Sequence, residues 1–151
     1  MTINLKNDTD REIDSKKTKI MIEKILDDFL KDSSEKTINL LLTNDGEMKK
    51  YNEKFRHKEG STDILSFEYG LDQEVIGEII ISLETIEKNA KELNESFEEE
   101  FYYILIHGVL HVLGFDHIED EEAEKMDEIQ DEYFEKLFRS RTDLSIQRED
   151  L

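Results

Sequence analysis

The chain has 151 residues, the length of one domain, and carries 39 acidic against 20 basic side chains, a net charge of −19. This charge opposes nonspecific attraction to nucleic acid or anionic lipid. The absence of cysteine excludes disulfides and thiolate metal sites, so His, Asp and Glu are the strong metal ligands that remain. No signal peptide opens the sequence and no apolar run approaches the roughly 20 residues that span a bilayer, so we expect a cytoplasmic protein.

The first part of the chain predicts two strands, each followed by a helix. Residues 2–5 are predicted to form a short strand, and the apolar spacing of residues 15–30 predicts an amphipathic helix. Residues 37–43, TINLLLT, are nearly all apolar, which predicts a strand buried on both faces. Asn44, with Glu47 three residues on, indicates a capping box and predicts a helix through about Arg56.

The second part predicts two adjacent strands and then helices only. The strands are residues 63–67 and 74–82, with a Gly- and Asp-containing turn between them. Ser82 is expected to cap a helix that runs to about Leu93.

The last two helices complete the predicted fold. Ser96 with Glu99 forms a capping box that opens a helix ending at Gly114. A final helix is expected over residues 119–138, with a polar tail from about residue 139. These elements predict one α+β domain over the whole chain, with one mixed sheet of about four strands and about five helices.

Charge is distributed unevenly along the chain. Residues 49–58, KKYNEKFRHK, hold five Lys or Arg side chains and one Glu, a local excess of four positive charges. Residues 119–135 are densely acidic. The simplest interpretation is two solvated helix faces of opposite sign.

Three of the four histidines fall within eleven residues, HGVLHVLGFDH. His107 and His111 are four apart in a predicted helix, so their side chains project from one face, one turn apart. Gly114 can turn the chain back and bring His117 to the same ion. Three nitrogen ligands leave one tetrahedral position open, which is typical of catalytic zinc and predicts hydrolytic chemistry with one zinc ion. The alternative is three ordinary histidines on a surface or core helix.

The histidine spacing also matches the zinc protease pattern H-E-x-x-H-x-x-G-x-x-H, except that Gly108 replaces the glutamate that acts as general base. A peptide hydrolase of that kind needs a carboxylate at this position. Asp116 is the nearest acidic alternative, and it could equally orient a ligand imidazole. Glu78 is a second carboxylate without an assigned role, so the base stays unassigned.

The segment HGVLHVLGFDH, residues 107–117, resembles the signature of the YbeY endoribonucleases. Upstream, YNEKFRHKEGSTDILSF from Tyr51 to Phe67 is similar to that family's Asn- and Arg-containing helix and its T-D-V-L-S-F strand. Weaker likenesses are Gly77-Glu78-Ile79 to the family's G-D-I, and Met126 and Glu132 to a Met and a Glu of its last helix. The chain departs from the family at Ser61 and Glu68, where Pro is usual, and at Glu78, where Asp is usual.

The resemblance implies a zinc-dependent endonuclease acting on single-stranded RNA in ribosomal RNA maturation and ribosome quality control. It implies three His ligands for zinc, His107 among the catalytic residues, and an Arg56 that is important for activity. Arg56, with Lys54 and Lys58, would then bind the substrate, since a guanidinium holds a phosphate bidentately. The expected partners are single-stranded RNA, ribosomal RNA or the small ribosomal subunit, with neither DNA nor membrane.

Two other functions remain open. A zincin-like metalloprotease is favoured by the histidine spacing and opposed by Gly108. A noncatalytic ribosome-assembly factor would use zinc only to hold its fold, and a fourth protein ligand from Asp116 or from residues 119–122 would indicate it.

Overall fold

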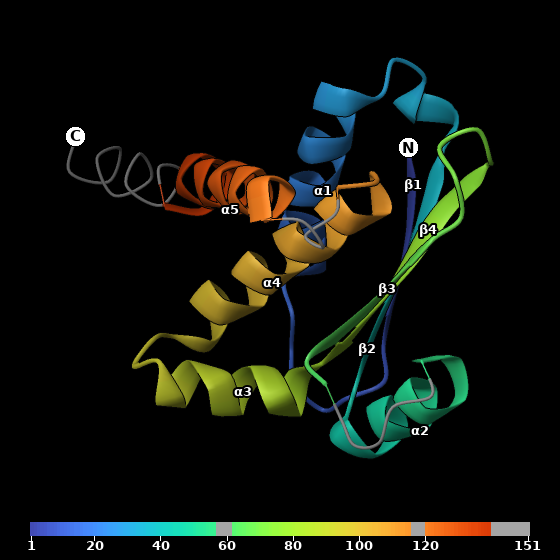
Figure 1. Cartoon of the computed structure of the whole chain (residues 1–151). Coiled ribbons are helices and arrows are strands. Elements are labelled where there is room, and N and C mark those ends of the chain that lie inside the picture. The colour runs from blue at the N-terminus through green and yellow to red at the C-terminus, as the bar shows by residue number, and fades with distance from the viewer. Residues whose placement is uncertain (57–61, 116–119, 140–151) are drawn as a thin grey trace.

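Four strands form one mixed sheet with helices on both of its faces (Figure 1). The computed structural model describes residues 1–56, 62–115 and 120–139. The predicted α+β fold, with a four-stranded mixed sheet and five α-helices, is confirmed over these ranges. The elements in chain order are β1 (Thr2–Asn7), α1 (Ser15–Phe29), β2 (Thr37–Thr43), α2 (Asp45–Arg56), β3 (Ile64–Glu68), β4 (Val75–Ser82), α3 (Leu83–Glu92), α4 (Phe97–Val112) and α5 (Asp120–Phe134).

The strands lie in the order β1-β2-β4-β3, with β1, β2 and β4 parallel and β3 antiparallel to β4 at the edge. The register places Asn4 beside Asn39 and Asn39 beside Glu78. Side chains alternate between the two faces of a strand, so these three residues share one face of the sheet. The other face carries the core.

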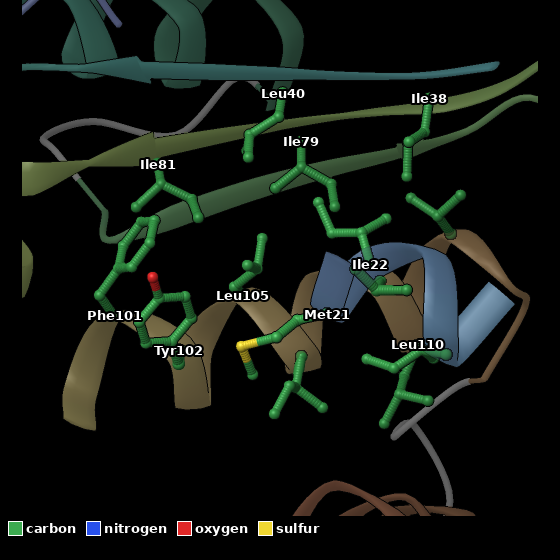
Figure 2. Close-up of a cluster of buried hydrophobic side chains, with 14 of the residues drawn as sticks. Met21, Ile22, Ile38, Leu40, Ile79, Ile81, Phe101, Tyr102, Leu105 and Leu110 are labelled. Carbon is green, nitrogen blue, oxygen red and sulfur yellow. The ribbon is translucent and has the colours of Figure 1, made fainter. Parts of the chain in front are cut away.

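The core lies between the sheet and the helices α1 and α4 (Figure 2). Ile38, Leu40, Ile79 and Ile81 point from β2 and β4 toward the helices, and each is at most 1% exposed. Each such side chain contributes about 1.5–3 kcal/mol by leaving water. The helix residues that meet them include Met21, Ile22, Phe101, Leu105 and Leu110.

The opposite face of the sheet is covered only in part, by α2. Met48 of α2 packs there against Leu65 and Ile80 in a second, smaller apolar cluster. The prediction that β2 is buried on both faces is therefore wrong for one face. Alternate residues of β2 are fully buried beneath α1 and α4, whereas Asn39 and Leu41 are half-buried because α2 covers only one end of their face.

The start of α2 is fixed by side-chain hydrogen bonds. Asn44 Oδ1 accepts from the Glu47 backbone N–H at 2.9 Å, which is one of the two hydrogen bonds of the predicted capping box, while Glu47 Oε1 accepts from Lys50 Nζ at 3.1 Å. The Asp45 carboxylate accepts from the hydroxyls of Ser82 and Thr85 and from Lys88 Nζ. Partial burial alone would raise the pKa of Asp45, but the hydrogen bonds from Lys88, Ser82 and Thr85 outweigh it and lower the pKa to about 2. The carboxylate thus stays ionised and ties α2 to α3.

Element boundaries differ from the predicted ones by one or two residues at most positions. β1 extends to Asn7 because it pairs with β2 as far as Leu42. The predicted last helix is α5 followed by one π-helical turn, Glu135–Arg139. The polar tail falls outside the described residues and stays a prediction. Across the three described ranges, no helix combines the length and apolarity needed to cross a membrane.

Candidate metal centre

Helix α4 carries the first two histidines of the predicted site. Its start is a complete capping box, in which Ser96 Oγ accepts from the Glu99 N–H and Glu99 Oε1 accepts from the Ser96 N–H. Its end is closed by backbone bonds from the Gly114 N–H to the His111 carbonyl and from the Phe115 N–H to the Leu110 carbonyl. Gly114 has φ +98°, as the predicted glycine turn requires. His117 lies outside the described residues.

His107 and His111 project from one face of α4, as their spacing predicts. Their Nε2 atoms lie 3.1 Å apart, and their half-buried rings are 4.6 Å apart between centroids. Two ligand nitrogens at about 2.0–2.1 Å from one tetrahedral zinc ion are separated by roughly 3.3 Å. The described geometry therefore fits a shared metal ion.

Gln130 of α5 holds the ring of His107. Gln130 Nε2 donates to the Tyr103 carbonyl at 3.0 Å, which turns the amide oxygen toward His107 Nδ1 at 3.1 Å. An amide oxygen can only accept, so Nδ1 carries the proton and Nε2 is the nitrogen through which His107 could bind a metal. Gln130 is 2% exposed.

Gln130 was not singled out from the sequence, although a signal exists. Met126, Gln130 and Phe134 are spaced by four, so a glutamine interrupts the apolar stripe of α5. A buried polar side chain on such a stripe needs a partner. The sequence could not reveal that the partner is His107, because the two residues are 23 positions apart.

Replacing Gln130 by leucine is expected to weaken zinc binding about 10- to 100-fold, because His107 loses the group that fixes its tautomer. The measurement is a competition titration against a zinc chelator. Gln130→Glu is the matched control, since a carboxylate still accepts from Nδ1, and it should bind close to the wild type. Equal zinc affinity of Gln130→Leu and wild type would contradict the role assigned to Gln130.

Two of the three predicted substrate-binding residues, Lys54 and Arg56, lie at the end of α2. Arg56 is the last residue of this helix, and its side chain is outside the part that the structure describes. Lys54 is exposed near the same end, and Lys58 lies in the undescribed segment that follows. α2 lies on the opposite side of the sheet from α4 (Figure 1).

Within the described ranges, no three His, Asp or Glu side chains gather into a set that could hold a metal.

Of the two carboxylates considered as general base, one is described. Glu78 Oε1 accepts from Asn39 Nδ2 at 3.1 Å, and its Oε2 accepts from the Tyr69 hydroxyl at 2.9 Å. Its neighbour Ile79 points toward α4, so Glu78 points to the other face of the sheet, away from the histidines. Partial burial and the Glu78 hydrogen bond raise the pKa of Tyr69 to about 12, so this hydroxyl remains a donor. Asp116 lies outside the described residues.

Gly108 packs directly against the sheet. A Cβ atom there would lie 2.7 Å from Ile64 Cδ1 and 3.2 Å from Ile79 Cγ2. The position that holds the general base in the zinc protease pattern is thus buried in the core. It has no room for a carboxylate.

A family model, curated proteins and a solved structure were compared with the chain. A family model described as "Endoribonuclease YbeY" matches residues 3–138. A protein of that name from Petrotoga mobilis is 50% identical over 144 residues, covering 93% of this chain and 99% of the relative. Another from Persephonella marina is 39% identical over 136 residues, covering 85% and 86%. A solution structure of a Thermotoga maritima protein is similar with a TM-score of 0.67 and 31% identity, covering 94% of this chain and 93% of that one.

Proposed function

Since the chain belongs to the YbeY endoribonuclease family, we propose that it cleaves single-stranded RNA with one zinc ion held by His107, His111 and His117. The observation that carries the proposal is the convergence of His107 Nε2 and His111 Nε2 to 3.1 Å. Gln130 supports the proposal, because its amide oxygen keeps the His107 proton on Nδ1 and leaves Nε2 unprotonated. His117 is assigned from the signature and the glycine turn alone.

The protein side chains have separate tasks in this mechanism. A bound zinc ion supplies a Lewis acid for a phosphodiester oxygen. His107 and His111 hold it from one helix face, and the rigid capped helix keeps their two nitrogens at a fixed separation. Gln130 orients His107 from α5.

The phosphate is assigned to the basic end of α2. A guanidinium presents two parallel N–H donors, the geometry that matches two phosphate oxygens. Because α2 and α4 lie on opposite sides of the sheet, Arg56 can stabilise the charge that develops on cleavage only if the RNA passes round the edge strand β3. Two lysines would add positive charge along the RNA: Lys54, which is exposed, and Lys58. This assignment rests on the family resemblance and on the local charge.

The negative net charge limits how the protein can bind its RNA substrate. At −19 the chain repels free RNA over most of its surface, so binding needs screening by divalent ions or docking on a larger assembly. The small ribosomal subunit would satisfy this need. We therefore extend the proposal to ribosomal RNA processing and ribosome quality control in the cytoplasm.

The test compares wild type with Arg56→Ala on a defined single-stranded RNA, with the metal content of each protein measured in parallel. Arg56→Ala should keep its zinc and cleave about 100-fold more slowly, because a charge-stabilising donor is lost. Lys19→Ala, an exposed change of the same charge on α1, is the control and should cleave like the wild type. A wild-type protein that binds zinc but leaves RNA intact would indicate the noncatalytic assembly factor instead.

A further inference from the structure

Three aromatic rings, one of them exposed and two half-buried, lie where α2 meets the edge strand β3. We call Tyr51, Phe55 and Phe67 the α2–β3 aromatic surface. The rings of Tyr51 and Phe55 stack at 6.1 Å between centroids and 15° between planes, and Phe67 meets Phe55 edge-on at 5.7 Å. Phe55 is 49% exposed. A large apolar ring is therefore held at the surface by two others.

The base of this surface is rigid. Tyr51 and Phe67 are half-buried and pack on the apolar cluster of Met48, Leu65 and Ile80, whose side chains are at most 6% exposed. The hydrogen bonds of Asp45 fix the start of the same helix. Phe55 is thus presented by ordered neighbours, so a flat ligand that covers it finds a preformed site.

The charge around the rings is positive, in contrast to the chain as a whole. Lys49, Lys50 and Lys54 are exposed on α2, and Lys54 Nζ lies 5.2 Å from the Phe55 ring centroid. Lys50 is paired with Glu47 at 3.1 Å, so Lys54 is the ammonium group beside the rings that can attract an anion. An aromatic face with an ammonium group beside it fits a chain of flat bases joined by phosphates.

We propose that the α2–β3 aromatic surface stacks bases of single-stranded RNA beside the cleavage site. This proposal deepens the proposed function and rests on it for the identity of the ligand. Duplex RNA keeps its bases stacked within the helix, so only an unpaired strand can offer a base to Phe55. The surface thereby selects single strands.

The position of β3 connects this surface to the histidines. Leu65 and Phe67 face α2, whereas the side chain of Ile64 faces Gly108 of α4, the residue that follows His107. β3 is the edge strand of the sheet in the described part of the chain, so only this strand separates the two sides there. An RNA strand anchored on Phe55 can pass round this edge toward His107.

The first test uses the absence of tryptophan from the chain. Phe55→Trp places a single indole in the surface, and its fluorescence is followed while a single-stranded oligoadenylate is added with a chelator present, so that the strand stays intact. Saturable quenching by the single strand, with little from a duplex of equal length, is expected. Leu93→Trp is the control, since Leu93 is 59% exposed at the end of α3, and its fluorescence should not respond. Equal quenching of both variants, or none, would overturn the proposal.

The second test uses Phe55→Ala, with Leu93→Ala as a matched loss of an exposed apolar side chain. Phe55→Ala should weaken binding of the single strand about tenfold and raise KM with little change in kcat, and Phe55→Tyr should restore both. Unchanged binding by Phe55→Ala would refute base stacking while leaving cleavage intact. Quenching in Phe55→Trp together with an inactive wild type would instead refute the cleavage proposal and leave stacking in place.

Discussion

Protein carrying His111→Ala is expected to lose its bound zinc and to cleave RNA at least about a thousandfold more slowly than the wild type. The physical reason is the 3.1 Å separation of His107 Nε2 and His111 Nε2, which lets the two nitrogens bind one ion. Removing one imidazole leaves His107 without the neighbour that completes this pair.

The measurement has a readout besides activity. Zinc at a hundredfold excess over Kd should stabilise the wild type by about 2.7 kcal/mol, and the Tm of a chain of this length should rise by roughly 5–10 °C. With a chelator, wild type and His111→Ala should unfold at similar temperatures, and only the wild type should respond to zinc. Cleavage that persists in metal-free His111→Ala would point to a contaminating nuclease.

The sequence predicted those features that depend on contacts within a few residues. The capping box of Ser96 and Glu99 spans three residues, and the turn at Gly114 depends on the freedom of glycine at positive φ, so both were predicted and both are present. The shared face of His107 and His111 follows from the period of an α-helix in the same way. Local signals of this kind fixed every helix and strand to within a few residues.

Features that depend on distant contacts were not predicted. The half-exposed face of β2 follows from the position of α2, and Asn39 of β2 bonds to Glu78, which lies 39 residues away in the sequence. Strand alternation places Glu78 and Ile79 on opposite faces of the sheet, but only the packing of α4 decides which of these faces carries the histidines. For the same reason the sequence could not show that Glu78, one of the two carboxylates considered as a base, lies on the face of the sheet away from His107 and His111.

The aromatic surface shows a further limit. Tyr51 and Phe55 are spaced by four on one helix, which could have been read as an ordinary core stripe. The structure buries Met48 and leaves Phe55 half-exposed because β3, the strand beneath it, is the last of the sheet. Strand order is set by non-local pairing, so a pattern of residues alone does not distinguish a buried ring from a presented one.

The second large effect is expected from Gly108→Glu, which restores the residue that the zinc protease pattern requires. The Cβ atom alone would lie 2.7 Å from Ile64 Cδ1, and overpacking of this kind costs about 1–3 kcal/mol. The carboxylate would enter a core without a partner for its charge, which costs several kcal/mol more or forces its protonation. Because domains are stable by only about 5–15 kcal/mol, we expect Gly108→Glu to lose cooperative unfolding.

Gly46→Ala is the control, because a Cβ there meets only Asn44 Oδ1 at 3.4 Å and lies in α2, where alanine favours the helix. Its Tm should equal or slightly exceed that of the wild type in a circular dichroism melt, whereas Gly108→Glu should give no sharp transition. If Gly108→Glu instead folded and hydrolysed a peptide in a chelator-sensitive way, position 108 would have access to the metal. The packing of α4 on β3 would then have to differ from the one described, and the metalloprotease interpretation would regain its missing base.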